Sequence, residues 1–407
     1  MRLFPLLFSL NIKTILIVAF LLRVIWACFI PVDPVSDSFL YDAFAKSIAA
    51  GNGYAFPNGD ITVYWPVGTS AIYAVLYQLF GVSHLPIVIL NVLIGVFIVW
   101  LSYAIALRYL GQKSAQIAAI LVACWPILIE FTTILASELI FILFVLAAVY
   151  SWGTKTLNPF LRAVIWGALV CAATYVRPTA LPLLALLPAL AWLAEGHMRA
   201  CITSFCIATL SAALLFSPWV YRNYQHFGEF VLVSANGGVN LWMGNNPNSN
   251  GGYTELPDIK FKNEVVRDQH FKHEAIDYIK NNPQQYMRLA ALRAVMTYKA
   301  ETIGIVWNGY FEKHFDQQKI LILKLISSVY WWFMLALASV GVYQIFKDKK
   351  LKLFHPIIIV PAFFFIFPIL TVAQDRYHLP INPFLAIFAA YAIQRFYQQN
   401  LNLKDSN

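Results

Sequence analysis

Long apolar runs, separated by short polar connections, dominate the pattern of this chain. A membrane-spanning helix needs about 20 consecutive, mainly apolar residues, and runs of this kind predict roughly ten spans. They cover residues 12–30, 86–107, 115–135, 138–152, 162–176, 178–194, 200–220, 320–346, 354–372 and 379–397. The pattern therefore predicts an all-α polytopic membrane protein.

Two longer interruptions divide the chain into three parts. Residues 1–220 form an N-terminal membrane module whose first outer loop is 31–81. Residues 221–319 form a polar insert, and residues 320–407 return to membrane helices. Gly/Asn-rich turns open the insert, and two helical runs split by Asn281-Asn282-Pro283 follow, which predicts a mixed, mainly helical structure.

The first outer loop has two short helical patterns. Apolar residues recur at helical spacing from Phe39 to Ile48, after Ser36 as a candidate N-cap, with Asp37 in the first turn. The apolar run 67–80 is too short to span a bilayer, so we expect it to lie in the interface. Carboxylates placed where water meets lipid indicate chemistry on a lipid-borne substrate.

Charge decides the orientation and the class of partner. The chain is 60% hydrophobic and 12% charged, with a formal net charge of +9. This excess does not indicate a nucleic-acid partner, because the basic residues lie in short loops between apolar runs, as the positive-inside rule requires. They predict a multi-pass protein of the inner (plasma) membrane with cytoplasmic termini and an extracytoplasmic first loop and insert. The basic residues expected on the cytoplasmic side are Arg108, Lys113, Lys155, Arg162, Arg199, Lys347, Lys349, Lys350, Lys352, Arg395 and Lys404.

Metal and disulfide chemistry have little support in the sequence. All five cysteines fall inside apolar runs and lack metal-ligand spacing. His270 and His273 could bind a metal with Asp277, but the neighbouring charges favour a solvated helix face. The residues themselves therefore predict no metal ligand.

Asp37 is the candidate general base. Its alternative role is a negative charge that stabilises a helix N-terminus. Asp42 follows on the same helix about 140° away, so the two carboxylates should not form a pair. Of Glu130 and Glu138, which bracket an outer turn, Glu138 begins the next span and is the one we expect in a pocket.

Three arginines at the outer ends of spans are candidate phosphate ligands. Arg177, Arg222 and Arg376 could each simply snorkel to the membrane surface. Three guanidinium groups facing one carboxylate-bearing loop suit a phosphate better, since the guanidinium fork matches phosphate oxygens.

These residues resemble a known group of proteins, the bacterial GT-C membrane glycosyltransferases, which include protein O-mannosyltransferases and lipid A aminoarabinose transferases. The similarity runs over nearly the whole chain. It rests on Ser217-Pro218-Trp219-x-x-Arg222-Asn223-Tyr224-x-x-Phe227-Gly228, Ser234-x-Asn236-Gly237-Gly238-x-Asn240-Leu241-x-x-Gly244-Asn245-Asn246-Pro247, Asp37-x-x-x-Tyr41, Arg177-Pro178 and Arg376-Tyr377-x-x-Pro380.

The resemblance implies a GT-C-type helix bundle and a sugar donor carried on a polyprenyl phosphate, used on the extracytoplasmic face with inversion. It also implies that Asp37 is the catalytic base. The residues expected to bind substrate are Tyr41, Asp42, Glu138, Arg177, Arg222, Asn223, Arg376 and Tyr377. The mannosyltransferases have two adjacent acidic residues at this place, whereas Ser38 follows Asp37 here, which leaves a divalent cation as an open cofactor.

The function predicted is an integral membrane glycosyltransferase. Its acceptor hydroxyl belongs to a lipid, a glycan or a protein. An oligosaccharide polymerase or ligase is the nearer alternative, and a lipid-linked sugar flippase or transporter the more distant one. A transporter predicts ionisable groups near the bilayer midplane and repeated halves, but the polar residues here concentrate at one face.

Overall fold

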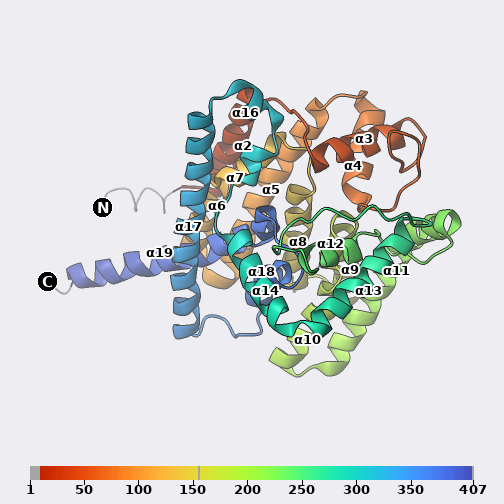
Figure 1. Cartoon of the computed structure of the whole chain (residues 1–407). Coiled ribbons are helices and arrows are strands. Elements are labelled where there is room, and N and C mark those ends of the chain that lie inside the picture. Colours follow the sequence, from red (N-terminus) through yellow and green to blue (C-terminus); the bar gives the residue numbers. More distant parts are fainter. Residues whose placement is uncertain (1–9, 155, 406–407) are drawn as a thin grey trace.

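The protein is almost entirely helical (Figure 1). The computed structural model describes residues 10–154 and 156–405. Lys155 and the chain ends, on which part of the topology prediction rests, lie outside that range. The described residues contain no β-strand. They contain two isolated β-bridges, one between Pro34 and Asn308 and one between Ala55 and Ile61. The predicted all-α class is confirmed.

Every apolar run predicted from the sequence coincides with helical structure. The N-terminal module contains α2 (Ile12–Phe29), α3 (Asp37–Ala49), α4 (Gly68–Phe80), α5 (Leu85–Leu110), α6 (Gln112–Ala123), α7 (Pro126–Glu130), η1 (Phe131–Thr133), α8 (Glu138–Trp152), α9 (Pro159–Val176), η2 (Pro178–Ala180), α10 (Leu183–Glu195) and α11 (Met198–Phe227). The helix α11 thus continues past the predicted start of the insert at 221.

The insert is mainly helical, as predicted. It contains α12 (Gly237–Gly244), α13 (Glu264–Asn281), α14 (Pro283–Tyr298), α15 (Ile303–Val306) and α16 (Gly309–His314). The C-terminal part contains α17 (Gln317–Lys347), α18 (Pro356–Leu370), η3 (Asp375–Ile381) and α19 (Asn382–Asp405). In Figure 1, α12, α13 and α14 lie in front of the membrane helices.

Several helices can cross a membrane. Among the described residues, five helices are long and apolar enough: α2, α5, α9, α11 and α17. A sixth span results if α6 and the segment Pro126–Thr133, bent by 58° against each other, count as one. The apolar segments Glu138–Trp152, Pro178–Leu193 and Pro356–Leu370 are shorter. The protein is a multi-pass membrane protein, and the number ten stays a prediction.

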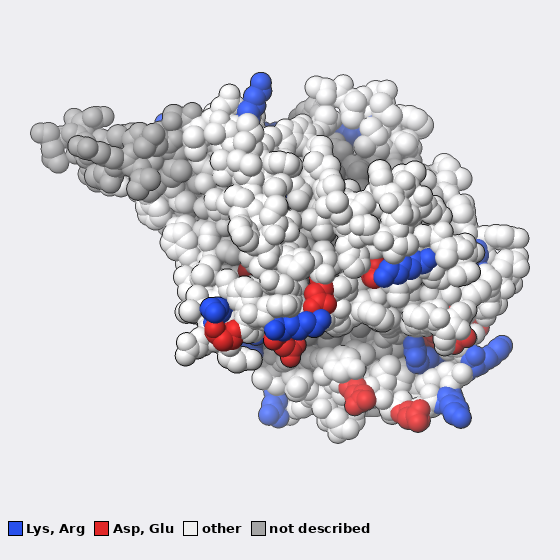
Figure 2. Space-filling model, turned by 90° about the horizontal axis from the view of Figure 1, so that it is seen from above, with Lys and Arg blue, Asp and Glu red and all other residues white. Residues whose placement is uncertain are grey.

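The surface of these helices suits lipid contact. Large apolar side chains lie exposed on them, including Ile17, Phe97, Leu214 and Phe333. On the face drawn in Figure 2, charged side chains gather toward one side and a wide area carries few of them. An exposed apolar surface of this extent needs a non-aqueous neighbour.

Small residues let the helices approach closely. The helix α19 packs against α17 and α6, and α9 packs against α11. A methyl group added at Gly341 of α17 would lie 1.9 Å from the backbone oxygen of Phe388 on α19. Gly167 lies in the same way against Ala208, with 2.4 Å to its oxygen. Close approach of two backbones at a small residue is typical of membrane helix pairs.

Contacts with the insert hold the first outer loop in place. Asn308 donates to the oxygen of Pro31 at 3.0 Å, and Lys313 pairs with Asp33 at 2.6 Å. The carboxylate of Glu264 accepts from the Thr62 hydroxyl at 2.8 Å and from the backbone N–H of Val63 at 2.8 Å. The two polar segments therefore form one layer over the membrane helices.

Ser36 lies at the N-cap position of α3, but its predicted capping role is wrong. Its side chain makes no capping hydrogen bond, and its backbone has φ 55° and ψ −131°. A capping serine has extended backbone angles, whereas Ser36 lies at positive φ, which L-residues rarely adopt. The bond is lost because this conformation turns the chain sharply just before Asp37.

Candidate active site

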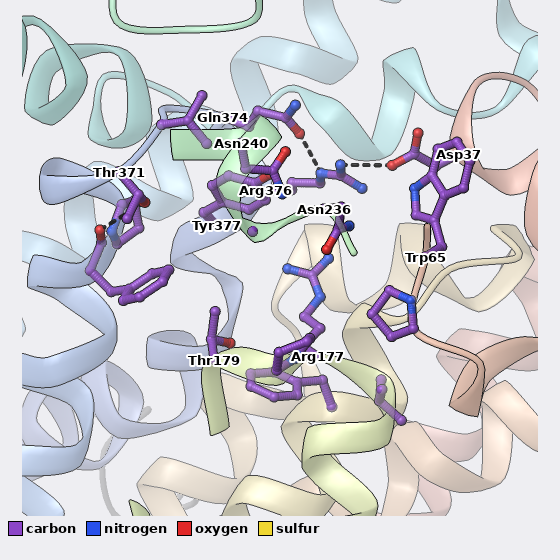
Figure 3. A pocket seen from close by; sticks show the side chains of 18 of the residues that line it. Asp37, Trp65, Arg177, Thr179, Asn236, Asn240, Thr371, Gln374, Arg376 and Tyr377 are labelled. Atoms are coloured by element: carbon purple, nitrogen blue, oxygen red, sulfur yellow. Dashed lines mark hydrogen bonds and ion pairs between the residues drawn. The ribbon is translucent and has the colours of Figure 1, made fainter. Parts of the chain in front are cut away.

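A central cavity of about 390 Å³ lies where the first outer loop, the insert and the C-terminal helices meet (Figure 3). Asp37 and Tyr41 reach it from α3, Arg177 from the end of α9, and Arg376 and Tyr377 from η3. The remaining lining residues are Tyr64, Trp65, Pro66, Phe141, Val176, Pro178, Thr179, Pro182, Asn236, Gly237, Asn240, Met243, Tyr253, Phe364, Phe367, Pro368, Thr371, Val372, Gln374 and Pro380.

An ion pair in this cavity joins α3 to η3, two elements that lie far apart in the sequence. Nη2 of Arg376 donates to Oδ2 of Asp37 at 2.8 Å, and Figure 3 shows the arginine reaching across to the carboxylate. Arg376 also donates from Nε to Oε1 of Gln374 at 2.5 Å and lies over the Trp307 ring, 4.0 Å from its centroid. Asp37 keeps 23% of its side chain exposed, so a substrate can still reach it.

Glu138 connects this pair to a second arginine. It is 1% exposed, and its Oε1 accepts a hydrogen bond from Nη2 of Arg177 and lies 3.5 Å from Nη1 of Arg376. Nε of Arg177 donates to the hydroxyl of Ser137 at 2.9 Å. Two carboxylates and two guanidinium groups therefore alternate in the order Asp37, Arg376, Glu138, Arg177.

The alternation stabilises the charged forms. Burial lowers the pKa of Arg376, but the nearby carboxylates, Asp37 foremost, raise it above its ordinary value. Burial and then the negative charge of Asp37 raise the pKa of Tyr41 to about 12, so this phenol stays neutral. The formal charges of the two carboxylates and the two guanidinium groups sum to zero.

The two arginines differ in how many of their N–H groups remain available to a ligand. Arg376 directs all three of its nitrogens at Gln374, Asp37 and Glu138. Arg177 directs Nε at Ser137 and Nη2 at Glu138, and its Nη1 has no hydrogen-bond partner within the described residues. Tyr377 lies between the two arginines, with its ring centroid 5.8 Å from Arg177 and 5.4 Å from Arg376. Arg177 is therefore the arginine that is ready to bind an anion.

Asp42, predicted to bind substrate, points away from this cavity. It is buried and accepts hydrogen bonds from Lys46 at 2.6 Å and from the Tyr77 hydroxyl, with His84 at 3.4 Å. Burial alone would raise the pKa of Asp42, but the hydrogen bonds from His84, Lys46 and Tyr77 lower it to about 2. Asp42 thus fastens α3 to α4, which agrees with its predicted separation from Asp37.

Arg222 and Asn223 also lie outside the central cavity. Arg222 donates to the backbone oxygens of Thr62 at 2.9 Å and Tyr54 at 3.0 Å. Asn223 is buried and donates to the oxygen of Val231 at 3.1 Å. Both residues fasten α11 to neighbouring loops, so the structure gives them a supporting place and not one against a cavity-bound substrate.

Several cavity residues were not predicted from the sequence. Asn236 and Asn240 belong to the glycine-rich motif that opens the insert, so their polar side chains beside tight turns were an available signal. Gln374 directly precedes the Asp375-Arg376 pair. Trp307 does not line the cavity but lies against Arg376, and it had no signal in the sequence because its role depends on a contact between distant segments.

The donor set does not fit a divalent cation. Such an ion needs several oxygen ligands, most often carboxylates with free lone pairs. Asp37 and Glu138 each hold guanidinium groups instead. In the part of the chain that the structure describes, no three His, Cys, Asp or Glu side chains gather to hold a metal, and this includes His270, His273 and Asp277.

A family comparison covers part of the chain. Residues 65–221, less than half of the chain, match the family described as dolichyl-phosphate-mannose-protein mannosyltransferase. The match includes Glu138 and Arg177 but begins after Asp37. No curated protein sequence is similar enough to count as a relative.

Solved structures share the fold. The archaeal oligosaccharyltransferase AglB from Archaeoglobus fulgidus, in complex with an inhibitory peptide and a dolichol-phosphate, aligns with a TM-score of 0.59 and 12% identity over 97% of this chain and 52% of AglB. ArnT from Cupriavidus metallidurans, bound to undecaprenyl phosphate, aligns with a TM-score of 0.61 and 14% identity over 94% of this chain and 60% of ArnT. This chain therefore spans only half to three fifths of their length.

Proposed function

We propose that this chain is a member of the GT-C superfamily of membrane glycosyltransferases and transfers a sugar from a polyprenyl-phosphate donor to an acceptor hydroxyl. The observation that carries the proposal is the alternation of Asp37, Arg376, Glu138 and Arg177 beside a cavity with one apolar wall. A carboxylate and a guanidinium group with a donor to spare are the two groups that this reaction needs.

The central cavity suits a lipid phosphate. Its apolar wall includes Phe364, Phe367 and Pro368 of the apolar helix α18, and Pro182 at the start of α10. A polyprenyl chain can stay against these helices while its phosphate meets Nη1 of Arg177. Guanidinium–phosphate hydrogen bonds are charge-assisted and stronger than neutral ones.

Asp37 is the proposed base. It takes the proton of the acceptor hydroxyl as the acceptor oxygen bonds to the anomeric carbon. The bond from that carbon to the phosphate oxygen breaks, and its electron pair leaves with the polyprenyl phosphate. Attack opposite the leaving group inverts the anomeric carbon. Arg376 orients the Asp37 carboxylate, and Arg177 stabilises the charge that grows on the departing phosphate.

The proposal includes an orientation. The first outer loop and the insert, which form the site together with η3 and the adjoining ends of α8 and α9, face the extracytoplasmic side of the cell inner membrane, and both termini are cytoplasmic. The support is the distribution of basic residues in the short connections on the other side. Because both carboxylates hold arginines, we infer that transfer needs no divalent cation.

Replacement of the base tests the proposal. Asp37→Asn keeps the shape of the side chain but removes the proton acceptor, so cleavage of polyprenyl-phosphate hexoses or pentoses should fall at least about 100-fold. The matched control is Asp60→Asn, an exposed aspartate of the same loop whose carboxylate, within the described residues, accepts only from Asn58, at 2.7 Å. Donor cleavage that survives in Asp37→Asn would overturn the assignment of the base.

The same assay separates the alternatives. A polymerase or ligase would use the same base and phosphate ligand, and would differ only in its acceptor. A flippase would move the lipid without breaking the sugar–phosphate bond. Cleavage that depends on Asp37 therefore excludes a function restricted to transport.

A further inference from the structure

A second cavity, of about 890 Å³, adjoins the central one at Asp37. Five residues line both cavities: Asp37, Tyr64, Trp65, Met243 and Tyr253. The proposed base is therefore part of the wall between two spaces. Reagents that enter from different sides can meet at its carboxylate.

The two cavities are built from different parts of the protein. The lining of the second cavity comes only from the first outer loop (34–37, 39–40 and 64–65) and the insert (243, 253 and 255–256). Neither Pro182 nor any residue of α18 or η3 lines it, although all of these contribute to one side of the central cavity. The occupant of the second cavity thus enters through the polar layer and not from the apolar helices.

The walls of the second cavity are rich in aromatic rings. Phe39 is 56% exposed and Tyr253 is 66% exposed. Tyr64 and Trp65 lie deeper, with ring centroids 4.3 Å apart and an angle of 79° between the rings. Aromatic faces carry negative charge and attract the partly positive C–H groups of a sugar ring. The exposed faces of Phe39 and Tyr253 are thus free to pack against a bound ring.

The charged groups of the second cavity are all acidic. Asp37 and Glu255 line it, with no lysine or arginine among its lining residues. Glu255 has no ion-pair or hydrogen-bond partner within the described residues, so its oxygens can accept from hydroxyl groups. Arg376 balances the charge of Asp37, so Glu255 supplies the uncompensated negative charge that disfavours an acceptor with a phosphate or carboxylate group. The lining therefore favours a neutral molecule with many hydroxyl groups.

Two further features fit this occupant better than a peptide. Extended peptides bind chiefly through main-chain hydrogen bonds, whereas this cavity offers ring faces and carboxylates. Ser36 lines the same cavity, and its backbone is held at φ 55° with no capping bond from its side chain. Strained backbone of this kind gathers at functional sites, and here it presents a hydroxyl beside Asp37.

We propose that the second cavity binds a carbohydrate acceptor. A neutral pyranose ring packs against Phe39 and Tyr253, donates hydroxyl hydrogen bonds to Glu255 and points one hydroxyl at Asp37. This inference rests on the proposed function, because the hydroxyl becomes the nucleophile of the same transfer. Its proton passes to Asp37, its oxygen bonds to the anomeric carbon of the donor, and polyprenyl phosphate leaves.

The test compares acceptors in the reconstituted full chain. Each reaction contains a polyprenyl-phosphate hexose and one probe: neutral methyl pyranosides and disaccharides, a Ser/Thr-containing peptide, or a long-chain alcohol. Released polyprenyl phosphate is measured against basal hydrolysis by water, and products are identified by mass spectrometry. We expect at least one glycoside to raise release about 10-fold and to yield a new disaccharide or trisaccharide.

Variants locate the effect in the second cavity. Phe39→Ala should raise the KM for the glycoside about 10-fold, the upper range for loss of one aromatic contact, while the affinity for polyprenyl phosphate is retained. Phe230→Ala is the matched control, since Phe230 is 71% exposed and lines neither cavity. Glu255→Gln should raise the same KM, and Asp258→Asn, three residues further along, should not.

The outcomes separate this inference from the proposed function. If the wild-type protein shows no hydrolysis of the donor that depends on Asp37, the transfer reaction itself is contradicted. Intact hydrolysis that only the peptide or the alcohol accelerates, or that no glycoside accelerates, would overturn the carbohydrate acceptor alone. An unchanged glycoside KM in both Phe39→Ala and Glu255→Gln would place the acceptor elsewhere.

Discussion

Removal of Arg177 should weaken the binding of the donor phosphate by an amount that follows from its contacts. The side chain is 15% exposed, so water screens it little, and its Nη1 is the donor that remains for an anion. A hydrogen bond to a charged group contributes about 1.5–3 kcal/mol, which corresponds to a rise in Kd of about 10- to 150-fold in Arg177→Ala. Arg177→Lys should recover only part of this, since an ammonium group cannot contact Ser137, Glu138 and a phosphate with the geometry of a planar fork.

Thermal unfolding in the presence of lipid can measure this effect. At a polyprenyl phosphate concentration 100 times the wild-type Kd, the free energy of unfolding of the wild type should rise by about 2.7 kcal/mol. A variant that binds 100-fold more weakly should gain only about 0.4 kcal/mol. Polyprenol, which lacks the phosphate, gives the baseline for each protein. Arg288→Ala, which removes an exposed arginine of α14, should behave as the wild type.

Folding must be controlled separately, because Arg177→Ala leaves Glu138 buried with only Arg376 at 3.5 Å as a cationic partner. Removal of one partner of a buried ion pair destabilises a protein by about 3–5 kcal/mol. The double variant Arg177→Ala/Glu138→Gln removes the uncompensated carboxylate and should regain part of that stability. A phosphate-specific gain of wild-type size in either variant would refute the assignment of Arg177.

Three other predictions concern stability, cofactor and topology. Asp42→Asn should lower the free energy of unfolding at pH 7 by on the order of 2 kcal/mol, because the pKa of Asp42 is about 2 in the folded protein, below its ordinary 3.8. Because the pKa is lowered, this stabilisation is complete above about pH 4 and is lost as the pH falls toward 2. The free energies of unfolding of the wild type and the variant should therefore converge in acid. A difference between them that stays the same at every pH would contradict this explanation. Donor cleavage should continue in a chelator such as EDTA, and a loss that added Mg²⁺ or Mn²⁺ restores would show that the carboxylates release their arginines to a metal. Asn248→Cys, introduced into a protein without its native cysteines, should react with an impermeant maleimide added outside intact cells, and labelling only after lysis would reverse the proposed orientation.

Local patterns in the sequence were sufficient to predict the helices. A run of apolar residues has few stable options other than a helix that satisfies its own backbone hydrogen bonds in lipid, so α2, α5 and α17 appear where their runs occur. The short helices α3 and α4 followed from periodicity and length in the same way. The N-cap expected at Ser36 failed because the tertiary structure imposes a backbone conformation at that residue that composition does not reveal.

The candidate site depended on contacts that no local pattern contains. Asp37 and Arg376 are 339 residues apart in the chain and 2.8 Å apart in space. Charge type and position at the outer ends of spans were enough to propose Asp37, Arg177, Arg222 and Arg376 as one group. They could not separate Arg222, whose donors are taken up by backbone oxygens of the first outer loop, from the arginines that face the cavity.

The sequence by itself determined that the chain is a helical membrane protein with its polar residues gathered at one face. It did so because hydrophobic periodicity and charge act over distances of a few residues, within one helix or one loop. Only the tertiary structure decided that Asp37 faces two cavities while Asp42, one helical turn and a half further along, is buried against Tyr77. Whether a carboxylate can react or only supports the fold depends on which distant segment packs against it, and packing brings such segments together without leaving a repeat in the chain.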